Sequence, residues 1–322
     1  MNMRFDQAGR RGAAVQIDDA DVRPGFERAA ANGVPGVQWL DQAALRELEP
    51  DVAGVAALLS PSTAIVDYPA IARSFAADVT RAGGEVLTST PVTALQVRGD
   101  DDVLVETRGR SVRLSRLVIC AGLQADLLAA TVGDKPTPEI IPFRGEYLRL
   151  RPHAVGRVRR LIYPVPDPRY PFLGVHLTPR VDGTADLGPN AVLALAREGY
   201  RRRDVSLDEL GRLARSAAFR RLARQHWMTG VREMRGSLWR RAYLTEARTY
   251  LPWVQPGDVT SAPAGVRAQA VDPSGALVDD FRISQAGPVT SIRNAPSPAA
   301  TASMAIAEHI VAELRLPLGK ER

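Results

Sequence analysis

The sequence of 322 residues predicts a mixed α/β fold, and three observations lead to this prediction. Between residues 85 and 122, short runs of alternating apolar and polar residues follow one another, a pattern typical of strands. Residues 117–120, Leu-Val-Ile-Cys, are apolar throughout, as in a strand buried on both faces, and they lead into a helical pattern. Residues 205–250 are helical in pattern. Strands and helices therefore both contribute to the core.

The N-terminal part contains one expected strand and three expected helices. The short apolar core within residues 12–19 favours an extended segment, and residues 22–33 and 41–49 have helical patterns. A third helix is expected from Pro69, because proline is tolerated at a first helical position, up to the stop at Gly83-Gly84. Its apolar residues recur on one face at helical spacing: Ala72, Phe75, Ala76 and Val79.

Five strands are expected next, in residues 85–90, 92–97, 103–108, 111–115 and 116–122. The last of them ends in Ala121-Gly122 and is followed by a helix. A buried strand, a tight glycine and a helix form the half of a dinucleotide-binding fold in which a ligand approaches the backbone. Cys120 is expected to be a small buried hydrophobic residue with no redox role.

The second half alternates between sheet and helix. Residues 139–192 are rich in strands separated by Pro and Gly turns, which predicts a mixed or antiparallel sheet. Within the helical residues 205–250, Ser206 and Glu209 have the spacing of a capping box. Two strands and a closing helix follow from residue 259.

The closing helix has an unusual start. Ser297 is a suitable N-cap and Pro298 a suitable first residue, since its missing N–H costs nothing there. The backbone N–H groups of Ala299, Ala300 and Thr301 would then point out of the helix end, where the helix dipole is positive. Small side chains would let a flat or anionic ligand reach these donors. An ordinary capped helix, with Ala chosen for helix propensity, is the alternative.

Composition restricts the class of protein. Hydrophobic residues make up 45% of the chain, which is enough for a sizeable core, and no apolar run is as long as the roughly 20 residues of a membrane helix. The single cysteine and the N-terminus without an apolar signal region favour a cytoplasmic protein. The four histidines are scattered, so no metal site is expected.

Positive charge is concentrated in one segment. Residues 197–248 contain 14 Arg and 6 Asp or Glu, a net charge of +8 in a chain whose total is +6. The segment has no recognised nucleic-acid reader motif and little aromatic interleaving, so nucleic acid is not an expected partner. A solvated helical surface is favoured, and an anionic membrane surface is the alternative.

Several long stretches together indicate a family. "PAGVRAQAVDPSGALVDDF" followed by "RNAPSPAATASMAIAEHI" resembles the C-terminal part of the FAD-dependent L-2-hydroxyglutarate dehydrogenases or oxidases, members of the D-amino-acid-oxidase-like superfamily. "IIPFRGEYLRL", "LIYPVPDPRYPFLGVHLTPRVDGTADLGPNAV", "EGYRRRD", "AIVDYPAIA" and "RLVICAGLQADLLA" are similar to the same family in the same order. The resemblance implies a two-domain FAD-dependent oxidoreductase fold with interleaved domains.

One departure from the family pattern is clear. Family members begin with a strand, a G-x-G-x-x-G turn and a helix that hold the FAD pyrophosphate, then a ribose-binding acid and a flavin loop rich in His and Gly. None of these occurs here, and the glycines Gly9 and Gly12 lie in a basic polar stretch with no preceding strand. The expected fold is therefore N-terminally truncated, and FAD binding is expected to be weak.

The resemblance also implies residues for the substrate. Arg267 matches the superfamily position that binds the substrate carboxylate, which a guanidinium grips through two hydrogen bonds. Arg293 is a second candidate for the carboxylate, and Arg144 either joins them or pairs with Glu146. In the family, the strand with His176 roofs the substrate pocket, so His176 is the expected base or carboxylate ligand, with a satisfied core histidine as the alternative. Tyr163 of the same sheet would donate a hydrogen bond or simply pack.

For the cofactor, the resemblance assigns two groups of residues. Val92, Ala121 and Gly122 would line the adenosine half of FAD. The stretch facing the flavin would supply the positive end of the closing helix, together with a neighbouring glycine and asparagine: Gly265, Asn294, Ser297, Ala299, Ala300 and Thr301.

These observations lead to one favoured function and two alternatives. The favoured function is FAD-dependent oxidation of (S)-2-hydroxyglutarate to 2-oxoglutarate, with electrons passed to a membrane quinone or to oxygen. The alternatives are a related flavin oxidoreductase for another 2-hydroxy or 2-amino acid, and a non-catalytic remnant unable to hold FAD. The expected location is cytoplasmic or peripheral on the inner membrane. Residues 61–138 and 259–322 are expected to bind FAD, and residues 1–60 and 139–258 to bind substrate.

Overall fold

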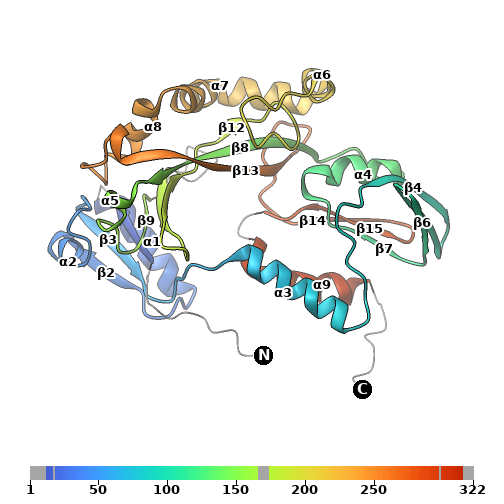
Figure 1. Cartoon of the computed structure of the whole chain (residues 1–322), viewed down its shortest axis with the longest axis horizontal. Helices are drawn as coiled ribbons and strands as arrows, with labels where there is room; N and C mark the ends of the chain where they lie inside the picture. Colours follow the sequence, from blue (N-terminus) through green and yellow to red (C-terminus); the bar gives the residue numbers. More distant parts are fainter. Residues whose placement is uncertain (1–11, 17–18, 166–173, 297–298, 315–322) are drawn as a thin grey trace. The chain divides into compact units, whose positions relative to one another are not determined.

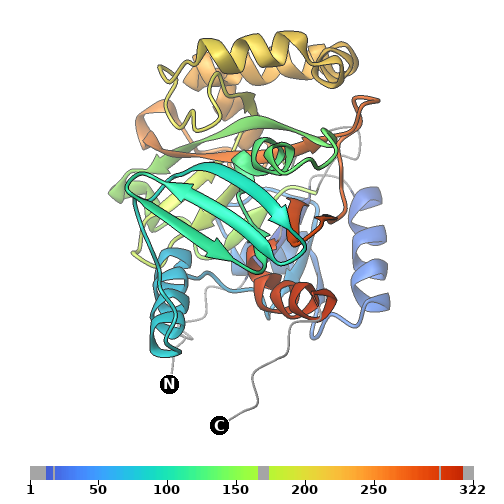
Figure 2. The ribbon, with the colours of Figure 1, turned by 90° about the vertical axis from the view of Figure 1, so that its right-hand side faces the viewer.

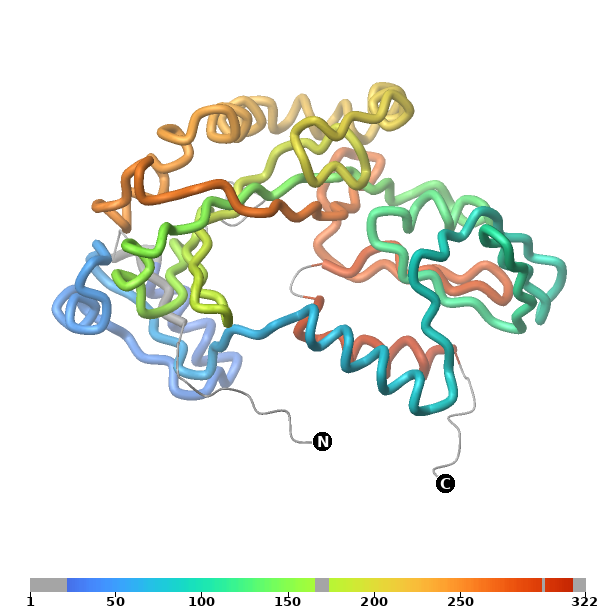
Figure 3. The backbone as a smooth tube through the Cα atoms, in the orientation of Figure 1, coloured from blue at the N-terminus to red at the C-terminus, as the bar shows by residue number. Residues whose placement is uncertain are grey.

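The computed structural model describes residues 12–16, 19–165, 174–296 and 299–314 (Figure 1). The chain folds into two compact units, and it passes back and forth between them, as the backbone trace shows (Figure 3). Unit 1 comprises residues 1–86, 144–193 and 227–265. Unit 2 comprises residues 87–143, 194–226 and 266–322. The expectation of interleaved domains is thereby confirmed.

Unit 1 is built on the larger sheet. Its strand order is β2-β3-β1-β9-β10-β11-β8-β12, with β13 also paired to β8. Most pairs are antiparallel, and β1 and β9 are parallel, so the sheet is mixed, as residues 139–192 predicted. The strands are β1 (Gly12–Gln16), β2 (Gln38–Asp41), β3 (Ala56–Ser60), β8 (Glu139–Leu150), β9 (Leu161–Tyr163), β10 (His176–Pro179), β11 (Ala185–Gly188), β12 (Val192–Leu193) and β13 (Val259–Val271). Residues 139–143 of β8 and 266–271 of β13 belong to unit 2.

Helices accompany this sheet, and each starts where the sequence provides a cap or a proline. Asp41 caps α2 by accepting a hydrogen bond from the Ala44 N–H at 2.8 Å, and Asp67 caps α3 through the Ala70 N–H at 3.0 Å. The helices of this unit are α1 (Asp19–Ala31), α2 (Gln42–Leu48), α3 (Tyr68–Arg81), α5 (Pro152–Val155) and α8 (Arg240–Ala247), with the second part of α7 (Ala217–Leu238) and the short turn η2 (Pro256–Asp258).

The core of unit 1 lies between one face of the sheet and α8. Leu148, Leu177 and Leu187 lie in register on three neighbouring strands, and all are buried in this core. Two buried tyrosines bond to the sheet backbone from the helical side. The hydroxyl of Tyr243 lies 2.9 Å from the Glu146 carbonyl, and that of Tyr250 donates to the Val175 carbonyl at 2.5 Å. These bonds satisfy polar atoms that would otherwise be costly to bury.

Unit 2 contains two small sheets. Strands β4 (Val92–Gly99), β5 (Asp102–Thr107) and β6 (Arg110–Leu114) form an antiparallel meander, drawn in teal in Figure 2. In the other sheet, β7 (Leu117–Ile119) runs parallel to β15 (Val289–Asn294), and β14 (Arg282–Ala286) pairs antiparallel with β15. The helical elements are η1 (Gly122–Gln124), α4 (Ala125–Thr131), α6 (Leu207–Arg215), the first part of α7, η3 (Ala299–Ala302) and α9 (Ser303–Glu313).

Several expectations about elements are wrong. Residues 85–90 form no strand, and Ser89 has a positive φ of 54° that interrupts extended structure. The β7 strand is not buried on both faces: Val118 and Cys120 are exposed, because its apolar run alternates between a covered and an uncovered side. Likewise, the apolar face of α3 is on the surface, since no residue of this helix is buried.

The closing helix also begins later than expected. The α-helical part starts at Ser303, after the 3-10 turn at residues 299–302, and Ala302 makes no side-chain cap. Ser297 and Pro298, the expected cap and first residue, lie outside the described residues.

The unit boundaries differ from the predicted domain boundaries. Residues 61–86 belong to unit 1, and residues 194–226 belong to unit 2. The chain moves between units within the helical segment, where α7 has a non-helical residue at His226 (φ −120°, ψ 20°). A run of helical residues contains no pattern that predicts where the chain passes from one unit to the other. The roles of the two units, FAD binding and substrate binding, remain predictions.

Gly188 is a position where the fold requires glycine. Its φ is +142°, and a Cβ placed there would lie 2.8 Å from the Glu146 carbonyl oxygen and against the Tyr243 hydroxyl. Gly188→Ala is expected to lower the free energy of unfolding by about 2–4 kcal/mol, measured by chemical denaturation. Gly183→Ala is the control, because Gly183 also has a positive φ but open space around it, and it should cost clearly less. Equal losses would show that the contacts of Gly188 contribute nothing.

Candidate functional site

His176 lies at the start of β10 with a defined ring orientation. Its ring is stacked on that of Tyr163 in β9, with the centroids 4.4 Å apart and the planes 20° from parallel. The ring nitrogen Nδ1 lies 3.1 Å from the Gly174 carbonyl oxygen. Since a carbonyl only accepts, Nδ1 carries the hydrogen, and Nε2 is the acceptor of the neutral ring. The orientation of the His176 ring is therefore defined by these two contacts.

Strand alternation places this pair on the face away from the core. Leu177 is fully buried in the core of unit 1, so its neighbour His176 points to the other face. In register, His176 pairs with Gly188. A Cβ built at Gly188 would lie 3.0 Å from the ring of Tyr147. Tyr147 alternates with the core residue Leu148 and lies on the same face as His176. Sequence reasoning missed Tyr147, although the alternation in "GEYLRL" was a usable signal.

Arg144 lies on the core side of β8 instead. By alternation it shares its side with Leu148 and Leu150, and it is buried. Its Nη2 donates to Glu146 Oε1 at 3.1 Å, and the side-chain amide of Asn190 donates to the other carboxylate oxygen of Glu146 at 3.3 Å. This is the structural pairing that was the alternative for Arg144. A buried, paired guanidinium on this face is poorly placed to meet a substrate.

Gly265 and Arg267 lie on one face of β13. The strand alternates between exposed and partly buried residues, and both positions are exposed. Gly265 has open space where a Cβ would be, so backbone and ligand could approach closely there. Arg267 takes part in further polar or electrostatic interactions within the structure.

In unit 2, small residues follow the carboxyl ends of the parallel strands along the chain. The carboxyl ends of β7 and β15 lie at the same edge, since Ile119 pairs with Ser291. The residues after β7, Ala121 and Gly122, and those of the turn before α9 are small and mostly exposed: Ala299, Ala300 and Thr301. Gly122 has a φ of +50° and open space where a Cβ would be. Ligands of open α/β sheets bind outside the carboxyl ends of the strands, so this edge fits a flat cofactor.

The residues present therefore fit only part of an FAD molecule. Exposed small residues at the carboxyl edge of β7 and β15 suit an adenosine or flavin ring. The sequence contains no G-x-G pair, so no glycine-rich pyrophosphate turn is among the residues present. Val92 is the exposed first residue of β4, paired with Thr107, and is available to a ligand.

Arg293 and Asn294 have structural partners. Arg293 is 2% exposed; its Nη1 donates to Asp134 Oδ2 at 3.0 Å, and its Nη2 donates to the Pro138 carbonyl at 3.1 Å. Burial opposes ionisation of Asp134, but its bonds to Ser284, the Lys135 N–H and Arg293 hold the pKa of this carboxyl below its ordinary value. The side-chain amide of Asn294 donates to the carbonyls of Val278 and Asp280. These bonds tie the end of β15 to the segment before β14.

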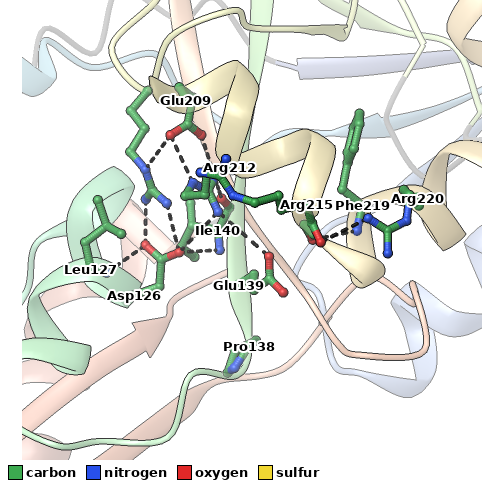
Figure 4. A network of polar contacts seen from close by, with 12 residues as sticks. Asp126, Leu127, Pro138, Glu139, Ile140, Glu209, Arg212, Arg215, Phe219 and Arg220 are labelled. Carbon is green, nitrogen blue, oxygen red and sulfur yellow. Dashed lines mark hydrogen bonds and ion pairs between the residues drawn. The ribbon is translucent and has the colours of Figure 1, made fainter. Parts of the chain in front are cut away.

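A buried charge network in unit 2 was not predicted (Figure 4). Arg197 donates two hydrogen bonds to the carboxylate of Asp126 in α4, of 2.6 and 2.9 Å, and one to Glu209 of α6, of 3.1 Å. Arg212 also bonds Glu209 and donates to the Ile140 carbonyl at 3.0 Å, while Asp126 accepts from the Ile140 N–H. The side chains of Arg197, Asp126 and Glu209 are each 7% exposed. The network connects α4, α6 and β8 around buried charges.

A cavity of about 530 Å³ lies in unit 1 under α7 and α8. Val175, the residue directly before β10, lines it, whereas His176 does not. Glu233 and Glu246 face it; each accepts a backbone N–H, from Ala191 and Val175 respectively, at 3.0 Å. Burial, and after it the nearby Glu246, raises the pKa of Glu233. None of the predicted site residues lines this cavity.

His176 in unit 1 and the carboxyl edge of β7 and β15 in unit 2 are the candidate elements, and comparison with known proteins shows the class of protein to which they belong. The family model described as "FAD dependent oxidoreductase" matches residues 3–314. In fold, the chain is similar to L-alpha-glycerophosphate oxidase from Mycoplasma pneumoniae with FAD bound (TM-score 0.72, 20% identity, 97% of this chain and 74% of that one). It is also similar to glycine oxidase from Geobacillus kaustophilus (TM-score 0.63, 18% identity, 95% and 70%).

Closer relatives are found by sequence. The chain is 43% identical to L-2-hydroxyglutarate dehydrogenase of Salmonella houtenae, over 98% of this chain and 74% of the relative. It is 40% identical to that of Escherichia coli K12 (99% and 76%) and 39% identical to the human mitochondrial protein (97% and 71%). The chain belongs to the FAD-dependent oxidoreductases and, within them, to the L-2-hydroxyglutarate dehydrogenase family. The family expected from the sequence motifs is thereby confirmed.

Proposed function

We propose that this protein oxidises (S)-2-hydroxyglutarate to 2-oxoglutarate with FAD as its cofactor. Membership of the L-2-hydroxyglutarate dehydrogenase family supports the reaction. The observation that carries the proposal within the structure is the orientation of His176. Its Nδ1 is held by the Gly174 carbonyl, and its ring is stacked on Tyr163. A base with a fixed tautomer is what removal of a hydroxyl proton requires.

The oxidation removes two electrons and two protons from the C2–H and hydroxyl of the substrate. FAD, when bound, supplies the acceptor for the hydride from C2. His176 Nε2 takes the hydroxyl proton, so the C–O bond becomes a carbonyl as the C–H bond breaks. Stacking on Tyr163 keeps the imidazole in place, and the Tyr163 hydroxyl serves as a hydrogen-bond donor to the substrate on the same face.

Arg267 is the proposed ligand of a substrate carboxylate. It is exposed on β13, and its guanidinium can form two parallel hydrogen bonds to a carboxylate. Arg293 and Arg144 are not part of this proposal, because both are buried and bonded within their own units. Among the three arginines expected at the substrate, Arg267 alone is exposed.

For FAD, we propose the carboxyl edge of β7 and β15. Ala121 and Gly122 would approach the adenosine part together with Val92, and the turn Ala299–Thr301 would face the flavin with its backbone donors. Asn294, at the end of β15, would be held near that edge by its bonds to Val278 and Asp280. Ser297 and Gly265 complete the proposed set, although Ser297 lies outside the described residues. Electrons would then pass to a membrane quinone or to oxygen.

Removing the carboxylate ligand should impair the reaction. Arg267→Ala is expected to lower kcat/KM for (S)-2-hydroxyglutarate by roughly a hundredfold, because two charge-assisted hydrogen bonds are lost. Arg267→Lys should recover only part of the loss, since it keeps the charge but not the two-pronged geometry. The measurement is steady-state kinetics with an artificial electron acceptor and saturating FAD.

The matched control is Arg98→Ala, which removes an exposed arginine from β4 and should leave kcat/KM unchanged. A panel of other 2-hydroxy and 2-amino acids in the same assay tests the substrate. Near-normal kcat/KM in Arg267→Ala would mean that another group holds the carboxylate.

A further inference from the structure

The turn that follows β7 is held by a segment distant in the chain. Arg197 donates a hydrogen bond to the Leu123 carbonyl in η1, and it binds the carboxylate of Asp126 near the start of α4. The side-chain amide of Gln124 lies 3.5 Å from the carboxylate of Glu198, the next residue in the chain. Two successive residues therefore hold the turn and the first residues of α4, and all of these groups belong to unit 2.

The guanidinium of Arg197 fixes its partners relative to one another. Nη1 donates to both the Leu123 carbonyl and Asp126, Nη2 donates to Asp126, and Nε donates to Glu209. Because a guanidinium is planar and rigid, a single side chain sets the positions of a backbone carbonyl and two carboxylates. Glu209 lies in α6, and its backbone N–H is bonded to the N-cap Ser206. The Leu123 carbonyl is thereby tied to α6.

The turn itself has few internal bonds. The element η1 has three residues, and its N-cap Ala121 makes no side-chain hydrogen bond. The Gln124 N–H is bonded to the Ala121 carbonyl at 2.9 Å. Gly122, the residue before Leu123, has a φ of +50° and open space where a Cβ would be. Since short 3-10 turns have poorer hydrogen-bond geometry than α-helices, the position of this turn depends on contacts from outside it.

We propose that Arg197 is a positioning residue for the FAD cofactor. Its bond to the Leu123 carbonyl holds residues 121–124 in the arrangement that meets the adenosine part of FAD. This inference rests on the proposed FAD site at the carboxyl edge of β7 and β15. A backbone that is already arranged for its ligand loses less conformational freedom on binding, so the contact increases affinity without touching FAD.

Arg212 provides a matched control within the same buried network (Figure 4). Among the described residues, its partners are Glu209, the Ile140 carbonyl, Asp126 and Glu139. It therefore connects α6 to α4 and β8, and none of its bonds goes to residues 121–124. Loss of Arg212 disturbs the charges of the network, whereas loss of Arg197 also removes the bond to the turn.

The test compares Arg197→Lys with Arg212→Lys in the full chain. Lysine keeps the charge in both variants, but at position 197 it cannot reach the Leu123 carbonyl and both carboxylates at once. The dissociation constant of FAD is measured by flavin fluorescence, without substrate, at a temperature at which circular dichroism shows each variant folded. Arg197→Lys is expected to raise the dissociation constant about tenfold, and Arg212→Lys to leave it near the wild-type value.

Two further readouts separate positioning from stability. Amide hydrogen exchange of a peptide covering residues 119–127, measured without FAD, should become several-fold faster in Arg197→Lys than in Arg212→Lys. In the oxidation assay, Arg197→Lys should need more FAD for its half-maximal rate, and kcat at saturating FAD should stay near the wild-type value. If Arg197→Lys does not fold, Arg197→Met with Asp126→Asn takes its place, because this pair of changes also removes the bond to the turn.

Three results would contradict the proposal: unchanged FAD binding in Arg197→Lys, an equally large change in Arg212→Lys, or no binding of FAD by the wild-type chain. FAD binding and amide exchange are both measured without substrate. A wild-type chain that binds FAD and does not oxidise 2-hydroxyglutarate would therefore contradict the proposed reaction and leave the comparison of the two arginines valid.

Discussion

Replacing His176 by glutamine is expected to lower kcat/KM for (S)-2-hydroxyglutarate by about a hundredfold to ten-thousandfold. General-base catalysis contributes factors of this size, and glutamine can hydrogen-bond but cannot take the proton. The structure makes His176 a stronger candidate than sequence alone could, because the Gly174 carbonyl fixes its tautomer and Tyr163 fixes its plane. The variant should fold normally, since the ring lies on the face away from the buried core.

Two further variants make this result interpretable. His153→Gln is the matched control, because His153 is an exposed histidine that pairs with Asp258, and its loss should not affect turnover. Tyr163→Phe keeps the stacked ring and removes only the hydroxyl, so it should cause a much smaller loss than His176→Gln. If His176→Gln with bound flavin keeps most of its kcat/KM, the proton goes to another group, and Tyr147 on the same face becomes the first residue to test.

Replacing Arg197 by methionine is expected to lower the free energy of unfolding by about 3–5 kcal/mol. Breaking a buried ion pair by removing one partner is costly, and here Asp126 and Glu209 would both lose the guanidinium that they share, with Arg212 as the cation remaining beside them (Figure 4). Both carboxylates are almost fully buried, so water cannot replace the arginine. Urea denaturation followed by circular dichroism gives the measurement.

The control is an arginine that forms an ion pair with an aspartate on the surface. Arg113 makes the same kind of two-pronged contact with Asp102, but its side chain is 70% exposed, so Arg113→Met should change the unfolding midpoint little. A double variant, Arg197→Met with Asp126→Asn, should recover part of the loss, because one unpaired charge is also removed. Equal midpoints for Arg197→Met and Arg113→Met would mean that the buried network contributes no net stability.

Local patterns in the sequence predicted many elements correctly. Pro69 lies in the first turn of α3, Ser206 caps α6 through the Glu209 N–H, and the meander β4–β6 follows its alternating residues. These features depend on contacts between residues close in sequence, which propensity and spacing describe well. The interleaved fold could be predicted only through the family resemblance, because pairing of distant strands leaves no local signal.

The errors share a cause. Val118 and Cys120 were expected to be buried, but both are exposed, since burial depends on which neighbours cover a face. Arg293 was expected at the substrate, and its burial against Asp134 could not be foreseen from residues 159 positions apart. Glu209 was expected as part of a capping box, but its carboxylate instead joins Arg197 and Arg212. Partners distant in sequence decide the role of each charged residue.

One measurement tests the central claim most directly. The purified chain is incubated with excess FAD, an artificial electron acceptor and either (S)- or (R)-2-hydroxyglutarate, and 2-oxoglutarate is quantified against reduced acceptor. The account predicts flavin-dependent formation of 2-oxoglutarate from the S enantiomer, one molecule for each two electrons transferred, and its near loss in His176→Gln. Formation of no 2-oxoglutarate by chain that has FAD bound, or equal rates with and without His176, would contradict it.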